Sequence, residues 1–184
     1  MTIVPSGPAA ATLTRGAAYD IVLLAHVLSA MIGFGAVIVA GGYALALLRS
    51  GPGSEAVLRY YRPGVNWAGR ALFVVPVLGV ILIGMSSGAW TFSDGWISTG
   101  LLLWAVAAAA GEMVLWPAER RLQVAVAEGA QAAEVAQAAE VAQAASAAPS
   151  SAPELRNGCF RVIVTAAAVD AMLIVATVVM VAKP

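Results

Sequence analysis

Four ionisable side chains lie within or beside apolar stretches of this sequence, and they have the greatest scope for chemistry: His26, Arg70, Glu112 and Asp170. Asp170 falls near the centre of the apolar run 160–181. An ionised carboxylate at the middle of a membrane helix costs about 2.5–3.5 kcal/mol on insertion scales. Asp170 therefore needs a partner or a proton, and it marks a candidate functional site.

Arg70 and Glu112 are expected at similar depths near the inner ends of consecutive antiparallel helices, at about 1.5 Å of rise per residue. A charge-assisted hydrogen bond between guanidinium and carboxylate would neutralise both groups. A structural salt bridge is therefore one interpretation of this pair. A proton or anion site is the other.

His26 and Asp170 are expected to differ in depth by roughly 5–10 Å. An Asp–His contact would orient the imidazole and prepare it as a haem or metal ligand, and His26 is the single candidate for that role. The alternatives for His26 are a core histidine bonded to a neighbour and a contact to another protein. Asp170 is neutralised by His26, by its own proton or by another chain.

The composition predicts an all-α integral membrane protein. Of the 184 residues, 61% are hydrophobic and 11% charged, whereas a soluble domain carries about 25% charged residues. A membrane-spanning helix needs about 20 apolar residues. Four segments meet that need and predict a four-transmembrane-helix bundle, with spans at about 18–48, 71–90, 98–116 and 160–181.

The basic residues predict the orientation of this bundle. Eight of the ten fall in or beside the two loops that follow the first and third spans: Arg49, Arg59, Arg62, Arg70, Arg120, Arg121, Arg156 and Arg161. Cytoplasmic loops carry an excess of Lys and Arg. Both termini are therefore expected on the outer side of the membrane. The expected location of the protein is the bacterial cytoplasmic (inner) membrane. The formal net charge of zero implies no surface for nucleic acid.

The expected domain organisation is a short extracytoplasmic tail, 1–17, and a membrane domain, 18–184, with a low-complexity cytoplasmic insert at 122–155. Three near-identical hexads rich in Ala, Glu and Gln occupy 127–144. These residues favour helix, so the third helix is expected to continue into the insert and to break at SAAPSSAP. The insert is either a spacer or a docking helix.

Small residues mark expected close contacts between helices, since small-xxx-small spacing lets membrane helices approach. The candidates are Gly33, Gly35, Gly41, Gly79 and Gly84. They pack either inside this bundle or against another subunit. Pro76 lies inside the second span and frees the carbonyl of Leu72, which predicts a kink.

Four segments carry a family resemblance: YDIVLLAHVLSAMIGFGA, NWAGRALFVVPVLGVILIGM, LWPAERR and VVMVAKP. Over about 18–184, without the alanine-rich insert, the chain resembles a bacterial membrane-protein family catalogued as domain of unknown function 2269. The resemblance implies a four-helix membrane fold and no assigned activity. His26 with its following small residues is also similar to the copper-resistance-D and membrane protoporphyrinogen-oxidase families, where an intramembrane histidine is linked to haem or copper. The latter family also uses an intramembrane lysine, but the single lysine here is Lys183.

Three functions are consistent with the sequence, which carries no P-loop, GxSxG or HExxH motif. The leading expectation is a non-catalytic membrane protein that packs with other membrane-protein subunits or with itself, for example as an accessory subunit of a respiratory electron-transfer complex. The second is a haem- or metal-binding redox protein using His26. The third is a small proton-coupled transporter using Asp170.

Overall fold

The computed structural model describes residues 16–51, 54–140 and 152–182. All regular structure within them is helical. Four helical segments are long and apolar enough to cross a membrane: Ala17–Ser50, Trp67–Met85, Gly95–Val135 and Pro153–Ala182. This confirms the all-helical class and the number of apolar helices expected from the sequence.

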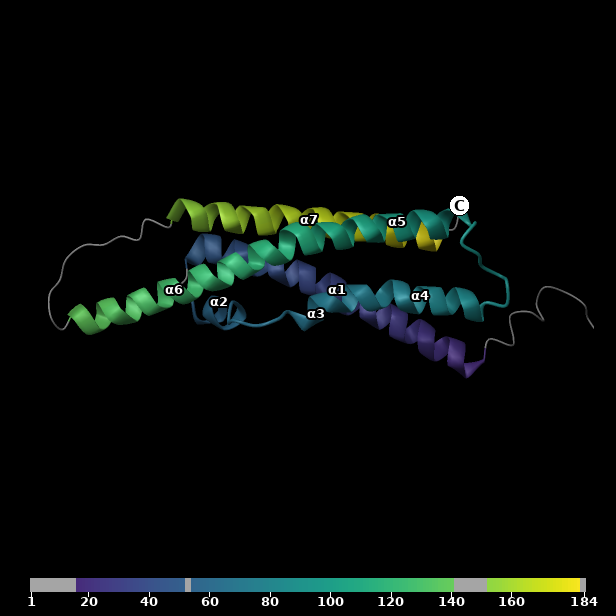
Figure 1. Ribbon diagram of the computed structural model, residues 1–184, viewed down its shortest axis with the longest axis horizontal. Coiled ribbons are helices and arrows are strands. Elements are labelled where there is room, and N and C mark those ends of the chain that lie inside the picture. The colour runs from purple at the N-terminus through teal and green to yellow at the C-terminus, as the bar shows by residue number, and fades with distance from the viewer. Residues whose placement is uncertain (1–15, 52–53, 141–151, 183–184) are drawn as a thin grey trace, which may run out of the picture.

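The four segments lie side by side in an elongated bundle (Figure 1). Helix α7 (Ala152–Ala182) packs mainly against α1 (Ala17–Ser50) and α5 (Gly95–Ala110), whereas α4 (Val74–Met85) packs mainly against α1. The first residues of α1 and the last residues of α7 lie at the same end, here called the terminal end. The opposite end holds the short α2 (Glu55–Tyr60) and α6 (Trp116–Glu140), and is here called the charged end.

The second apolar segment is interrupted close to its proline. It consists of α3 (Trp67–Arg70), a 3₁₀ turn at Ala71–Phe73 and then α4, which contains Pro76. Proline lacks the N–H that would bond the carbonyl four residues earlier. That carbonyl, on Leu72, instead accepts a hydrogen bond from the indole N–H of Trp104 at 2.9 Å.

The second helix ends earlier than the sequence predicts, at Met85 rather than near Trp90. Ser86 donates its hydroxyl to the carbonyl of Ile83 at 2.7 Å. Ser87 and Gly88 then adopt positive φ angles of 52° and 83°, and this left-handed backbone ends the helix. Residues 86–90 therefore belong to a turn rather than to the helix.

The third helix continues past the expected end of its membrane span at residue 116 and into the insert, as predicted. A π-helical turn, η3 (Gly111–Leu115), joins α5 to α6 just before Pro117, where a widened turn accommodates the missing proline N–H. Helix α6 continues to Glu140, as expected for the first part of the insert. The expected break at SAAPSSAP lies largely outside the described residues, and its last two residues already belong to α7.

Part of the insert is packed rather than exposed. Leu122 and Val126 on α6 are almost fully buried, and α6 contacts α7. Gly158 on α7 faces Leu122, since a Cβ at Gly158 would lie 2.9 Å from that side chain. Helix α7 begins at Ala152 instead of near residue 160 because its first turns cover this face of α6.

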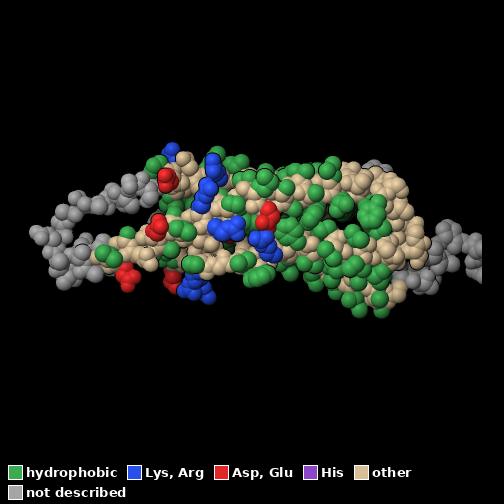
Figure 2. Space-filling model, in the orientation of Figure 1, with side chains coloured by type: hydrophobic (Ala, Val, Ile, Leu, Met, Phe, Trp, Pro, Cys, Tyr) green, Lys and Arg blue, Asp and Glu red, His purple; other side chains and the backbone are tan. Residues whose placement is uncertain are grey.

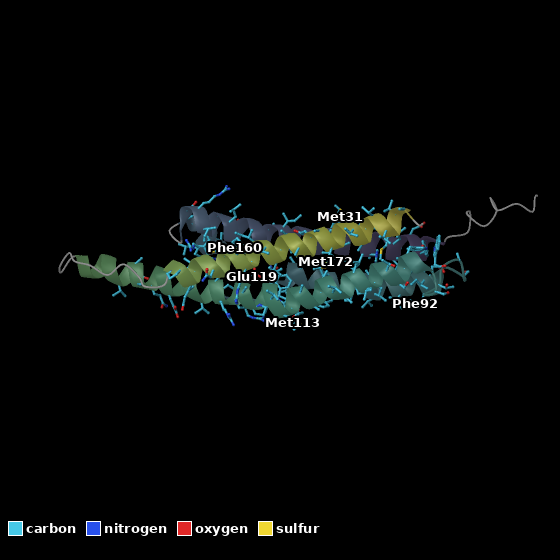
Figure 3. The ribbon with its side chains drawn as sticks, turned by 90° about the horizontal axis from the view of Figure 1, so that it is seen from above. Met31, Phe92, Met113, Glu119, Phe160 and Met172 are labelled. Carbon is cyan, nitrogen blue, oxygen red and sulfur yellow. The ribbon has the colours of Figure 1, made fainter. Side chains whose placement is uncertain are left out.

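The surface divides by chemistry along the long axis. On the face drawn in Figure 2, the charged side chains gather toward the charged end, and apolar side chains cover the rest. Large apolar side chains are exposed on the helices, among them Met31, Met113 and Phe160, labelled in Figure 3. An apolar exterior with charges at one end suits helices surrounded by lipid.

Candidate ligand site

A cavity of about 520 Å³ lies in the half of the bundle near the terminal end. Residues from α1, α4, α5 and α7 line it, together with Trp90 and Phe92 from the turn between α4 and α5. The lining residues include no Lys, Arg, Asp or Glu within the described part of the chain. The side chains with polar atoms are Tyr19, His26, Trp90, Trp96, Trp104 and Thr177. An apolar cavity with a few polar groups is the usual form of a small-molecule site.

His26 is placed by a glycine on the facing helix. A Cβ at Gly79 would lie 3.4 Å from Cε1 of His26, so the small residue lets the ring lie against α4. There Nδ1 lies 2.9 Å from the carbonyl oxygen of Val75, next to Pro76. This interaction fixes the imidazole at the cavity wall.

The His26 hydrogen bond also sets the position of the ring proton. A carbonyl oxygen only accepts, so Nδ1 carries the hydrogen. An imidazolium without a counterion is unfavourable among apolar side chains, and the neutral ring then keeps an unprotonated Nε2. This atom makes no hydrogen bond within the described part of the chain and is not enclosed by protein.

Two further cavity residues give their hydrogens to backbone carbonyls. Trp104 donates its indole N–H to Leu72 at 2.9 Å. Thr177 donates its hydroxyl to Leu173 at 2.8 Å. Their hydrogens are therefore already used, while the Thr177 oxygen keeps the capacity to accept.

The expected salt bridge between Arg70 and Glu112 is confirmed. Nη1 of Arg70 donates to Oε1 of Glu112. Both side chains are about one third exposed, and Glu112 projects from the π-helical turn ahead of Pro117. The pair joins the second and third apolar segments, away from the cavity, and satisfies both charges.

The expected contact between His26 and Asp170 does not form. His26 bonds to the carbonyl of Val75 instead, because the ring finds that acceptor on the helix packed against it. Oδ1 of Asp170 is buried and has no hydrogen-bond partner among the described residues. Position along the chain predicts the depth of each residue but not the lateral direction of its side chain.

The five candidate glycines fall into two groups. An added Cβ would lie 2.7 Å from Leu72 at Gly33, 3.1 Å from Ala166 at Gly41 and, as above, 3.4 Å from His26 at Gly79. These three allow close packing inside the bundle. Gly35 and Gly84 have no atom within 4 Å of such a Cβ, so packing within this chain does not explain them.

A buried polar cluster near the charged end was not found from the sequence. Glu119 on α6 (Figure 3) is 5% exposed and accepts hydrogen bonds from the hydroxyl of Tyr60 at 2.8 Å and the amide of Asn66 at 3.5 Å. Tyr60 also stacks on Tyr43, with ring centroids 4.1 Å apart. Burial and the neighbouring Glu119 carboxylate raise the pKa of Tyr60 above its usual range. The sequence LWPAERR carries no local pattern that marks Glu119 as buried, because its partners Tyr60 and Asn66 lie more than fifty residues earlier.

Fold and cavity together define an all-helical protein with four apolar helices of membrane-spanning length and a hollow between them. Comparison with protein-family models, curated proteins and solved structures finds no match. The resemblance to the family of domain of unknown function 2269 therefore stays a prediction.

Proposed function

We propose that this chain is a multi-pass protein of the bacterial cytoplasmic membrane that binds a small apolar ligand between its helices. The observation that carries the proposal is the cavity of about 520 Å³ with His26 in its wall. Its volume falls within the range of about 300–1,000 Å³ that is common for ligand sites. The role is binding rather than catalysis.

The proposed orientation puts the charged end in the cytoplasm and both termini outside. Seven arginines near that end are exposed: Arg49, Arg59, Arg62, Arg120, Arg121, Arg156 and Arg161. The positive-inside rule supports this placement. In this orientation the cavity opens in the outer half of the membrane.

The ligand proposal is tested by identifying small molecules that stay with the protein. The full chain is extracted in mild detergent, and the bound molecules are measured by mass spectrometry against Ala30→Phe, which fills the cavity wall. We expect a molecule bound in a fixed ratio to the wild type and lost from Ala30→Phe. Ile38→Phe, an exposed site on the same helix, is the matched control. Equal retention by all three proteins, with equal helix content by circular dichroism, would contradict the proposal.

A second candidate function is assembly with another membrane protein, as expected for an accessory subunit. The outward face of α1 supports it: Ile38 is 61% exposed, and Gly35 and Gly42 on either side of it leave open space at Cβ. Small residues at a helix surface let a second helix approach closely.

Assembly is tested by mild-detergent purification and native mass spectrometry. We expect a partner, or a second copy, in a fixed ratio with the wild type. Gly35→Ile should release it, while Gly84→Ile, at an equally open position on α4, should not. A solitary chain in the wild-type sample would exclude this second function.

A further inference from the structure

Three of the six cavity side chains with polar atoms have their hydrogens bonded to backbone carbonyls, and they define what a head group beside them must supply. Nδ1–H of His26, Nε1–H of Trp104 and Oγ1–H of Thr177 all go to backbone carbonyls. Two of these carbonyls, on Leu72 and Val75, lie just ahead of Pro76 on the facing helix. What His26 and Thr177 still present is the capacity to accept: the lone pair of Nε2 and the lone pairs of Oγ1.

We propose that the cavity binds a neutral lipid with a single apolar chain and a hydroxyl head, and that this hydroxyl donates to Nε2 of His26. The inference rests on the proposed ligand-binding function and names its ligand class. A quinol and a long-chain alcohol share this chemistry. A quinone carbonyl and an ether do not, because both only accept hydrogen bonds.

The charge of the lining selects against ionic ligands. None of the described lining residues is Lys or Arg, so a phosphate or an ionised carboxylate would be buried without a counterion. Haem would meet the same cost of burying negative charge. Its iron suits the Nε2 lone pair, but its two propionates would lack a cation at the described lining.

The shape of the lining suits a chain. Apolar side chains from four helices form most of the wall, including Leu23, Met31, Phe34, Val80 and Leu101. The cavity is bounded near the terminal end by Trp90 and Trp96, whose rings pack edge to face with centroids 5.3 Å apart. Indole rings favour the membrane–water interface. A ligand whose apolar chain lies among the helices can therefore place its head group at His26 and its apolar chain against the aliphatic side chains of the cavity wall.

The test compares probe pairs in which one member carries a hydroxyl that can donate a hydrogen bond and the other member can only accept one. The full chain is placed in nanodiscs of saturated phosphatidylcholine, and binding is followed by fluorescence of the tryptophans that line the cavity. The pairs are dodecanol with dodecyl methyl ether, and decylubiquinol with decylubiquinone. One hydrogen bond contributes about 0.5–1.5 kcal/mol, so the hydroxyl member of a pair should bind about three- to tenfold more tightly.

The His26→Phe variant tests the acceptor. It keeps a ring of similar size, so the ether should bind as before while the preference for the alcohol disappears. Ile38→Phe, at an exposed site on the same helix outside the cavity lining, serves as the matched control and should keep the His26-dependent preference. The wild-type comparison stands by itself should His26→Phe fail to fold.

The outcomes separate the two proposals. A preference in the quinol pair alone assigns the site to a ring-bearing lipid, and a preference in the alcohol pair alone assigns it to a simple chain lipid. Equal affinity within both pairs overturns the hydroxyl inference and leaves ligand binding intact. No binding of any probe overturns both. Added haem that binds with a Soret spectrum abolished by His26→Phe would also overturn the inference, since Nε2 would then be an iron ligand.

Discussion

The two halves of this bundle are built from similar residues but packed differently. Toward the charged end, the core is continuous, with Val37, Ala44 and Leu47 of α1 against Val162 and Ala166 of α7, all almost fully buried. Toward the terminal end, few side chains of α1 or α4 are buried and the helices enclose the cavity. Both halves consist mainly of aliphatic residues, so composition alone does not separate them.

The difference shows where polar contacts are used to hold helices together. The packed half has the Arg70–Glu112 pair and the Glu119 cluster in addition to its apolar core. The hollow half is joined by hydrogen bonds from single side chains to the backbone beside Pro76. Tight packing stabilises a fold, whereas a ligand site needs space that packing would remove. The packed half is therefore the scaffold and the hollow half the site.

The largest expected effect is on the ion pair. Arg70→Glu places two carboxylates together at the edge of the apolar core, and breaking a buried pair costs about 3–5 kcal/mol, with the lower end expected because both side chains are partly exposed. We expect little folded protein in detergent. Adding Glu112→Arg should restore folding, measured by gel filtration and circular dichroism. Arg121→Glu, an exposed control, should fold. A double variant as poor as the single one would show that the pair does not stabilise the fold.

The next effect compares one substitution in the two halves. Ala44→Leu enlarges a fully buried side chain in the packed half, and overpacking costs about 1–3 kcal/mol. Ala30→Leu adds the same atoms at the cavity wall, where space exists. Thermal unfolding in detergent should therefore show a clear loss for Ala44→Leu and little change for Ala30→Leu. Equal losses would mean that the hollow half is filled by protein in solution.

A smaller effect is expected from the buried carboxylate cluster. Tyr60→Phe removes the shorter hydrogen bond to Glu119, which is 5% exposed, and hydrogen bonds to charged groups contribute about 1.5–3 kcal/mol. Asn66 still bonds Glu119, so the loss should lie near the lower value. Tyr43→Phe keeps the stacked ring and serves as the control. If Tyr60→Phe and the wild type unfolded identically, the Glu119 cluster would not stabilise the fold.

The smallest effect concerns two glycines on one helix. Gly33→Ala forces Leu72 to move, whereas Gly35→Ala meets no atom within 4 Å. Since alanine favours an exposed helix over glycine by up to about 1 kcal/mol, Gly35→Ala should leave stability unchanged or raise it slightly. Gly33→Ala should lower it. If Gly35→Ala were less stable than Gly33→Ala, Gly33 of α1 would not pack against Leu72.

Several features of the fold follow from positions along the chain. Long apolar stretches predict the number of membrane-length helices, since an unbroken helix is the way to satisfy backbone groups in lipid. Antiparallel order and helical rise place Arg70 and Glu112 at one depth, and this pair forms. Pro76 predicts that the carbonyl of Leu72 lacks its helical hydrogen bond, and in the structure this carbonyl accepts a hydrogen bond from Trp104.

The turn at Ser86–Gly88, the early start of α7 and the burial of part of the insert were not predicted, whereas the continuation of the third helix as α6 was. Residues 86–90 read SSGAW, and the positive φ angles of Ser87 and Gly88 end the helix before Trp90. The burial of Leu122 in the insert depends on a contact with Gly158 of α7, more than thirty residues later in the chain. Local composition carries no signal for such a contact.

The sequence by itself determined the class of the protein: four apolar helices, an ion pair at matched depth and a proline-released carbonyl. Only the tertiary structure decided which side chains meet across helices. His26 bonds Val75 rather than Asp170, Gly33 packs where Gly35 does not, and a cavity separates α4 from α7. The physical reason is that these helices are apolar on nearly every side. No periodic polar face marks which side of each helix points into the bundle. The rotation of each helix about its axis and the crossing angles are therefore set by packing against the other helices.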